Sequence, residues 1–342
     1  MSFYTYFLKR SIIYIAVFVL SASIVWALVR FAPGDPALTS FLRVMMAPGV
    51  RYTPEQIEAM KQQAIELLGL NLPLHEQYIM FWRNLLRGDL GYSTYFTAPV
   101  GDKLREYVFF DLILLTPAII VSWFIGNYIG ALAARYRSLD RVIVPIIYIL
   151  TATPYFLFGL IMAYTLGVAA REIVGEFFKP VITSTDIKNF LYNPSITTFY
   201  EFIRAYSLPF ISLVCVSMGG WASGMRTLMV YELESNYARY MESMGFSGKR
   251  IAAYAFRYAI NPQITGLGIQ LGTVIVGGLA FSAVFNYPGT GIALIYAINF
   301  RDVFLIQGIA IVYTLLVIAF NSVIDILYIL IDPRLRHEML GR

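Results

Sequence analysis

The sequence predicts an all-α polytopic membrane protein with about six transmembrane helices and an extracytoplasmic cap between the first and second helices. Composition is the first reason, because 58% of the 342 residues are hydrophobic, only 14% are charged, and the mean hydropathy is +0.65. A soluble domain carries roughly a quarter charged residues. Repeated long apolar runs, and the basic segments between them, are the other two reasons.

Six apolar runs are long enough to cross a bilayer, which takes about 20 mostly apolar residues in a helix. We expect the spans at about 11–31, 110–134, 142–168, 206–230, 260–285 and 303–331. Proline removes an intrahelical hydrogen bond and bends a helix, so the second and third spans should bend at Pro117, Pro145 and Pro154.

Basic residues predict which side of the membrane each connecting segment occupies, because short loops rich in Lys and Arg stay in the cytoplasm. With six spans, both termini and the basic segments near 135–141 and 226–258 fall on the cytoplasmic side. The segments 32–108, 169–205 and 286–302 then lie outside. The net charge of +5 thus follows from topology and does not indicate nucleic-acid binding.

The outer segment 32–108 is too long for a simple connection and predicts a folded cap. A helix should begin after Thr53, with Thr53 as the N-cap and Pro54 at the first helical position. A second, amphipathic helix should follow from Leu72, and its apolar face would include Leu74, Tyr78, Phe81, Trp82 and Leu85. A disordered loop is the alternative interpretation.

Polar and small residues within the spans have structural as well as functional interpretations. Asp111 and Asp325 lie near predicted span ends, where we expect them to reach water or cap a helix, although ionisable groups at membrane depth are functional candidates in general. Gly126 and Gly130 form a G-x-x-x-G pair. That spacing favours close packing of two helices, with a hinge as the alternative.

The residues needed for soluble enzyme chemistry are sparse. The single cysteine, Cys215, cannot form an internal disulfide, and the two histidines, His75 and His337, are far apart in the sequence. No G-x-x-x-x-G-K-[ST] phosphate-binding loop is present. We therefore expect no catalytic residues, no metal site and no cofactor bound by this chain.

Six regions, taken in order, resemble the inner-membrane permease subunits of dipeptide/oligopeptide-type ABC importers. They are L-V-R-F-A-P-G-D-P (28–36), L-G-L-N-L-P-L-H-E-Q-Y with L-L-R-G-D-L-G-Y-S (68–78 and 85–93), A-T-P-Y-F-L-F-G-L (152–160), Y-A-R-Y-M-E-S-M-G-F-S (237–247), F-N-Y-P-G-T-G (285–291) and V-I-D-I-L-Y-I-L-I-D-P-R-L-R (323–336). The resemblance covers essentially the whole chain.

This resemblance implies a type I importer permease in the cytoplasmic membrane of a prokaryote. Its partners would be a sister permease, two cytoplasmic ATPase subunits that carry ATP and Mg, and an extracytoplasmic solute-binding protein. Di- and oligopeptides are the implied cargo. An oligosaccharide importer permease of the same family stays open, as does the remoter possibility of a stand-alone channel or secondary carrier.

The resemblance also divides the chain into four regions. The N-terminal tail and first transmembrane helix occupy 1–31, and the cap occupies 32–108. The permease core of five helices occupies 109–332 and includes a cytoplasmic coupling loop at 231–258. A cytoplasmic tail occupies 333–342.

The segment M-E-S-M-G-F-S-G-K-R at 241–250 predicts a helix, a glycine turn and a second helix. Ser235 or Asn236 should cap the first helix, Gly245 should end it in a left-handed conformation, and Ser247 should cap the next. A chain without an ATP site must receive its driving force by contact, and this hairpin resembles the family's coupling element, the EAA loop. The candidate ATPase-coupling residues are Tyr237, Arg239, Glu242, Gly245, Ser247, Lys249 and Arg250.

Two departures and one alternative accompany this hypothesis. The small residues that give the loop its name would fall at Tyr240 and Met241, and this chain has lost both. An ordinary amphipathic helix at the membrane surface is the alternative. For the pathway itself, the fourth and fifth spans offer Met218, Trp221, Met225 and Gln270, although packing against the sister subunit or lipid would also explain these residues.

Overall fold

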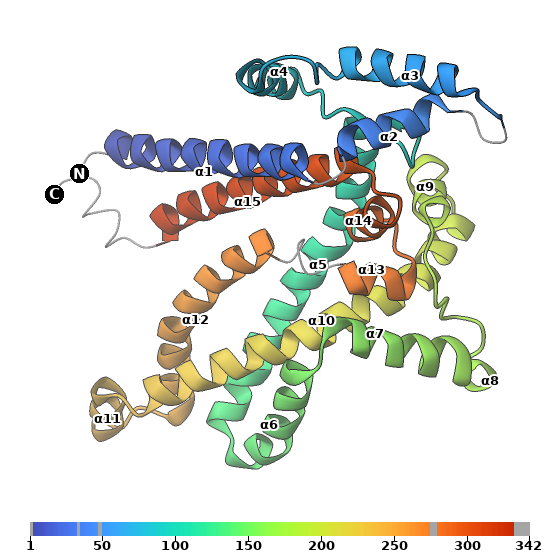
Figure 1. Ribbon diagram of the computed structural model, residues 1–342. Coiled ribbons are helices and arrows are strands. Elements are labelled where there is room, and N and C mark those ends of the chain that lie inside the picture. Colours follow the sequence, from blue (N-terminus) through green and yellow to red (C-terminus); the bar gives the residue numbers. More distant parts are fainter. Residues whose placement is uncertain (1–2, 33–34, 47–49, 274–278, 332–342) are drawn as a thin grey trace. The chain divides into compact units, whose positions relative to one another are not determined.

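The computed structural model describes residues 3–32, 35–46, 50–273 and 279–331, and nearly all of its secondary structure is helical (Figure 1). The exception is a two-stranded antiparallel hairpin in which β1 (Tyr92–Ser93) pairs with β2 (Ala98–Pro99). The chain forms two compact units. The first consists chiefly of Met1–Phe109 and Gly289–Ala319, and the second chiefly of Phe110–Pro288.

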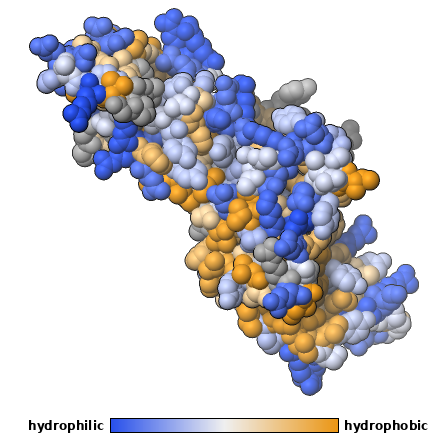
Figure 2. Space-filling view, turned by 90° about the vertical axis from the view of Figure 1, so that its right-hand side faces the viewer, coloured by the Kyte–Doolittle hydropathy of each residue, from blue (hydrophilic) through white to orange (hydrophobic). Residues whose placement is uncertain are grey.

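Four helices in the described part of the chain are long and apolar enough to cross a membrane. They match the expected first, second, fourth and sixth spans, and they are α1 (Phe3–Phe31), α5 (Val100–Arg135), α10 (Ile196–Leu233) and α15 (Val303–Ile331). Many of their apolar side chains are exposed, and orange apolar patches are visible on the face drawn in Figure 2. Lipid would cover such side chains in a membrane.

The expected third span is not one helix. It is divided into α6 (Arg137–Ala152) and α7 (Tyr155–Tyr164), and α7 continues into the π-helical turn η1 (Thr165–Ala169). The two parts are bent by 104°. Pro154 causes the break, because it disfavours helical backbone at Thr153, which is extended with φ −82° and ψ 124°. A single bent helix over 142–168 is therefore the wrong description.

The expected fifth span, 260–285, includes residues 274–278, which lie outside the described ranges. Its described parts belong to α12 (Gly248–Thr273) and α13 (Leu279–Phe285). Neither helix is among those long and apolar enough to count, so the structure supports four spans, or five with the bent pair. A short apolar helix that the sequence did not predict, α14 (Thr290–Asn299), follows α13.

The expected helices of the segment 32–108 are present in the first unit. Thr53 caps α3 (Pro54–Leu67) in a reciprocal capping box with Gln56, as the sequence predicts. The second helix, α4 (Leu74–Leu86), packs its aromatic face on α1. Tyr78 lies 5.0 Å from Trp26 between ring centroids, and its hydroxyl hydrogen-bonds Ser23. Leu74, in contrast, is exposed, and a further helix, α2 (Pro36–Met45), precedes α3.

Asp302 holds the core of the first unit together at the start of α15. Its side chain is fully buried and accepts hydrogen bonds from the Ser93 hydroxyl (2.6 Å), the Tyr95 amide (3.0 Å) and the Leu305 amide (3.1 Å). In the same unit, α5, α14 and α15 form an apolar cluster of Val100, Leu104, Ala293, Ala297, Leu305 and Ile309.

In the second unit, α10 packs against α6, α7, α12 and α9 (Ser184–Tyr192), with the short helix α8 (Arg171–Val174) before α9. Gly126 confirms the expected close packing of α5 on α10, because a Cβ there would lie 2.6 Å from the Trp221 Cβ and 2.7 Å from the Met218 carbonyl oxygen. A Cβ at Gly130 would likewise clash with the Ala222 carbonyl oxygen of α10. Packing rather than a hinge therefore explains this glycine pair.

Buried polar groups modify the prediction for the second unit. Asp111 lies well inside α5 and is 5% exposed, so the expectation that it reaches water at a span end is wrong. Nearby, Pro117 has no N–H for the Ile113 carbonyl. The Tyr206 hydroxyl of α10 donates to that carbonyl instead, at 2.8 Å. The buried Tyr287 hydroxyl donates to the Phe110 carbonyl in the same region.

Candidate functional site

A Schellman turn centred on Gly245 ends the short helix α11 (Asn236–Ser243), which follows α10. Gly245 has φ +79°, its amide donates to the Glu242 carbonyl at 2.9 Å, and the Phe246 amide donates to the Met241 carbonyl at 3.1 Å. These are the two hydrogen bonds that define the motif. The left-handed glycine expected from the sequence is thus confirmed.

Serines begin both helices of this hairpin. Ser235 is the N-cap of α11, where its side chain accepts from the Ala238 amide, so Ser235 rather than Asn236 has that role. The Ser247 carbonyl accepts from the Arg250 and Ile251 amides and so begins α12. The helix, glycine turn and second helix therefore occur where the sequence places them.

The hairpin is attached to α10 and α12 by its inner face. Ala238 of α11 is buried, α11 packs against α12, and the Tyr237 ring lies 5.5 Å from the Tyr258 ring of α12. The Tyr237 hydroxyl donates to the Glu232 carboxylate at 2.9 Å. The pKa of Tyr237 is raised to about 12, chiefly by partial burial and to a smaller extent by this hydrogen bond and the charge of Glu232. Tyr237 therefore remains a neutral hydrogen-bond donor at physiological pH.

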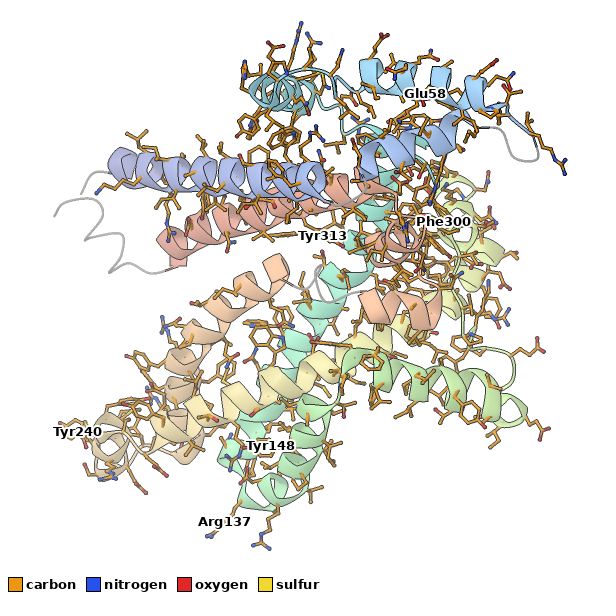
Figure 3. All side chains as sticks on the ribbon, in the orientation of Figure 1. Glu58, Arg137, Tyr148, Tyr240, Phe300 and Tyr313 are labelled. Carbon is orange, nitrogen blue, oxygen red and sulfur yellow. The ribbon has the colours of Figure 1, made fainter. Side chains whose placement is uncertain are left out.

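The outer face of the hairpin is open. Tyr240 is 66% exposed and Met244 is 58% exposed, and Figure 3 shows Tyr240 on the side of α11 that faces away from α10 and α12. The charged and polar candidates Arg239, Glu242, Ser247, Lys249 and Arg250 are exposed as well. The Arg250 guanidinium lies 4.8 Å from the centre of the Phe246 ring, across the turn. The structure thus brings five exposed candidates together around the turn at Gly245, while Tyr237 attaches the hairpin to its neighbours.

An ion pair that the sequence did not predict braces the end of α10 that leads to the hairpin. Two guanidinium nitrogens of Arg226, Nε and Nη2, donate to the two carboxylate oxygens of Asp140 on α6, at 2.5 and 2.7 Å. Bidentate pairs of this kind fix geometry as well as attract. Residues 86 positions apart form the pair, and no local sequence pattern could have indicated it.

The four pathway candidates have different surroundings in the second unit. Met225 is fully buried in an apolar cluster with Met229, Ala255 and Ala259, which is a packing role. Trp221 and Gln270 line a cavity of about 500 Å³ beside the break between α6 and α7. Met218 is partly buried on α10 and does not line this cavity. The structure thus brings two of the four candidates together.

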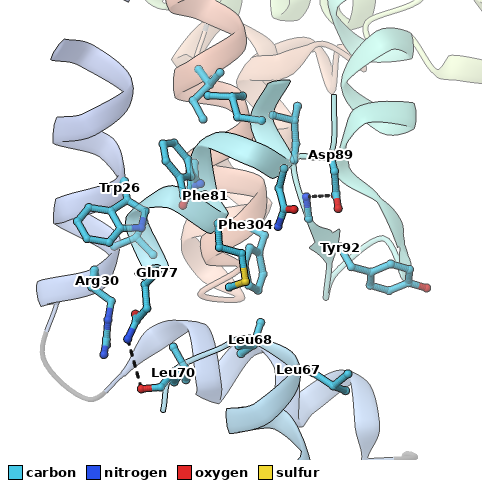
Figure 4. Close-up of a pocket in the computed structure, with 18 of the residues that line it drawn as sticks. Trp26, Arg30, Leu67, Leu68, Leu70, Gln77, Phe81, Asp89, Tyr92 and Phe304 are labelled. Atoms are coloured by element: carbon cyan, nitrogen blue, oxygen red, sulfur yellow. Dashed lines mark hydrogen bonds between the residues drawn. The ribbon is translucent and has the colours of Figure 1, made fainter. Parts of the chain in front are cut away.

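A second cavity, of about 470 Å³, lies in the first unit (Figure 4). Trp26 and Arg30 of α1, Gln77 and Phe81 of α4, and Phe304 of α15 line it. The Gln77 side-chain amide shapes its floor by donating to the Leu70 and Leu72 carbonyls at 3.3 and 2.7 Å. Its walls are mostly apolar, and the sequence gave no indication of it.

Four apolar helices of spanning length and a broken apolar helix pair indicate an integral membrane protein. Sequence comparison then identifies the class of transporter, because residues 126–337 match the family described as "binding-protein-dependent transport system inner membrane component". The chain belongs to this family. It is a multi-pass inner-membrane permease subunit, a transport component that is not itself catalytic.

Curated relatives match nearly the whole chain. It is 30% identical to a di/tripeptide transport system permease of Pseudomonas aeruginosa over 331 residues, which cover 92% of this chain and 93% of that protein. A probable D,D-dipeptide transport system permease of Escherichia coli is 29% identical, with 89% of both chains covered. An oligopeptide transport system permease of Bacillus subtilis is 27% identical over 336 residues, which cover 97% of this chain and 99% of that protein.

Proposed function

We propose that this chain forms the translocation pathway of an ATP-driven importer of di- and oligopeptides, together with a sister permease. Two cytoplasmic ATPase subunits, which carry ATP and Mg, would drive it, and an extracytoplasmic solute-binding protein would deliver cargo. Membership of the permease family and the peptide names of relatives that cover almost the whole chain support this function. The Gly245 hairpin is the observation on which the coupling mechanism rests.

The hairpin would transmit movement because its outer face is free and its inner face is rigid. Arg239, Glu242 and the large side chains of Tyr240 and Met244 would enter a groove on the ATPase. Closure of the ATPases would then push on α11, and the packing of α11 on α12, which includes the contact between the Tyr237 and Tyr258 rings, would pass the force to α12. A stiff turn is needed here, because a mobile one would absorb the displacement.

The proposed topology has six crossings, with both termini and the hairpin in the cytoplasm. It counts the bent α6–α7 pair as one crossing and the region from α12 to α13 as another. The segment 32–108 would then form an extracytoplasmic cap next to the binding protein. The even number of crossings agrees with the basic residues that flank the helices.

Reconstitution tests this function. The complete importer in proteoliposomes should take up a labelled dipeptide only when both the binding protein and ATP are supplied, with ATP on the hairpin side. Uptake by this chain and its sister without any ATPase subunit would contradict the proposal and favour a channel or carrier. Import of an oligosaccharide, with no import of di-, tri- or longer peptides, would replace peptide by sugar as the cargo.

A further inference from the structure

The ion pair between Arg226 and Asp140 lies at the base of the hairpin. Arg226 is close to the end of α10 at Leu233, after which α11 begins at Asn236. Asp140 is the acidic residue in the first turn of α6. The pair therefore joins the start of α6 to the part of α10 from which the hairpin extends.

The geometry of the pair makes it stronger than an ordinary surface ion pair. Nε and Nη2 of Arg226 donate to different carboxylate oxygens of Asp140, and the two side chains are only 29% and 27% exposed. Exposed pairs contribute little to stability, because water screens the charges and long side chains lose freedom, but a bidentate pair with arginine is an exception. Two parallel hydrogen bonds also fix the direction of approach. The pair can therefore hold α6 at a defined position on α10.

Close packing on its other sides leaves this end of α10 little freedom to turn away from α6. On the side of α5, a Cβ at Gly130 would lie 3.0 Å from the Arg226 backbone nitrogen. On the side of α12, Met225 and Met229 belong to a buried cluster with alanines of that helix. Because close-packed groups transmit displacement, movement of the hairpin base would move α10 together with these helices.

The far end of α6 reaches the cavity beside the α6–α7 break. A Cβ at Gly219 of α10 would lie 2.8 Å from the Leu150 Cβ and 2.9 Å from the Thr151 backbone nitrogen, so the two helices also touch there. Since Arg226 contacts the start of α6 and Gly219 contacts its end, α6 and α10 lie side by side with opposite directions. Thr151 and Thr153 line the cavity. A displacement of α6 would therefore move part of the cavity wall.

We propose that Arg226 and Asp140 are positioning residues that couple ATP hydrolysis to uptake, because they make α6 follow the hairpin when the ATPases move it. Without the pair, α11 would still move α12, against which it packs, but the start of α6 would slip along α10. This inference rests on the proposed ATP-driven import. It adds a second route for the force, from the hairpin through α6 to the α6–α7 break.

The test measures uptake of a labelled dipeptide and hydrolysis of ATP by the complete importer in proteoliposomes. Asp140→Asn and Arg226→Gln each remove one charge of the pair, and each should lower uptake per ATP hydrolysed by about fivefold. The double variant should show about the same loss and not the product of two losses, since one interaction can be removed only once. Arg226→Lys keeps the charge without the fork, so its loss should be smaller than that of Arg226→Gln.

Arg137→Gln is the matched control. Arg137 lies in the same first turn of α6 as Asp140, but it is exposed, and Figure 3 shows its side chain pointing away from the neighbouring helices. The substitution removes one charge from this end of α6 and should leave uptake per ATP unchanged. Thermal unfolding of each purified complex identifies the variants that are folded, and the ratio of uptake to hydrolysis is compared among those.

The outcomes separate this role from a structural one and from the proposed function. An unchanged ratio in Asp140→Asn and Arg226→Gln would overturn the role in coupling, even if their unfolding midpoints fall. Losses that multiply in the double variant would overturn it as well, because the two residues would then act separately. A wild-type importer whose uptake does not depend on ATP would instead contradict the proposed function, and the role in coupling would fall with it.

Discussion

Gly245 is required by a backbone angle and not by lack of space. Its φ is +79°, yet a Cβ added there would meet nothing within 4 Å. This left-handed conformation costs an L-residue roughly 1–2 kcal/mol, and it costs a β-branched residue more. The glycine therefore reports on the geometry of the turn alone, which makes it a selective target for mutation.

Gly245→Val should uncouple ATP hydrolysis from uptake, because strain of about 1–2 kcal/mol or more would open the turn that joins α11 to α12. Uptake per ATP hydrolysed by the reconstituted importer is the measurement. Gly248→Val is the matched control, since Gly248 is equally exposed and unobstructed but has ordinary helical backbone. Gly245→Asn should retain more coupling, because Asn tolerates the left-handed region. Normal coupling in Gly245→Val would count against this role.

Asp302→Ala should lower the stability of the first unit by about 2–4 kcal/mol, because two buried donors and one partly buried donor would lose their shared acceptor. Asp302→Asn, which retains an oxygen, should cost less. The midpoint of thermal unfolding of the purified complex would measure both effects. Asp102→Ala is the control, since that side chain is 68% exposed and its removal should be nearly neutral. Equal midpoints for the two alanine variants would refute the structural role of Asp302.

The role of a residue could be predicted from the sequence where its interaction partners lie only a few positions away. Thr53, Ser235 and Gly245 cap or end helices through atoms a few positions away, and the sequence indicates all three. The roles of Asp302 and Arg226 depend on partners more than 80 residues distant. Asp111 was misjudged because its position relative to the span end depended on where α5 begins, at Val100.

At the scale of elements, a proline in one helix explains a tyrosine in another. Pro117 leaves the Ile113 carbonyl of α5 without its usual donor, and the Tyr206 hydroxyl of α10 replaces it. Inside a membrane, where no water can substitute, such a replacement is necessary. The pair of substitutions below separates this role from simple packing of the Tyr206 ring.

Tyr206→Phe should destabilise the complex by about 1–3 kcal/mol, because the carbonyl stays buried without a partner. In a Pro117→Ala background the restored backbone N–H can bond to the Ile113 carbonyl, so Tyr206→Phe should then cost less. A double-mutant cycle of thermal unfolding measures this coupling. Costs that simply add would mean that the hydroxyl and the proline act independently.

Helix boundaries were less predictable than helix existence. Hydropathy located the four long apolar helices, since lipid-facing residues must be apolar along their whole length. The same signal runs uninterrupted through 142–168, although Pro154 breaks the backbone there. Hydropathy also failed to show α14, which has only ten residues and buries half of them in the protein, including Ala293 and Ala297 of the apolar cluster.

At the scale of the whole molecule, the bent α6–α7 pair decides the topology. Between the segment 32–108 and the hairpin lie α5, this pair and α10. With α5 and α10 each crossing the bilayer, the segment 32–108 and the hairpin lie on opposite sides if the pair also crosses. They lie on the same side if the pair returns to the side it left. The side of the membrane on which Glu58 and Tyr240 lie therefore tests the six-crossing proposal.

Cysteine labelling answers it, because Cys215 is the only cysteine and Cys215→Ser supplies a clean background. Glu58→Cys on α3 and Tyr240→Cys on α11 are both at exposed positions (Figure 3). An impermeant maleimide should label position 58 in right-side-out vesicles and position 240 in inverted vesicles. Labelling of both in the same vesicles would mean that the α6–α7 pair does not cross.

The hydrogen bond between Ser93 and Asp302 joins residues 209 positions apart, and this has a consequence for biosynthesis. A ribosome adds about 5–20 residues per second, so on the order of 10–40 s separates the synthesis of the two partners. During that interval the early helices sit in the membrane without the acceptor for Ser93 and Tyr95. Chains that stop before residue 302 never acquire this acceptor, so the Ser93 hydroxyl and the Tyr95 amide would have to find another partner in them.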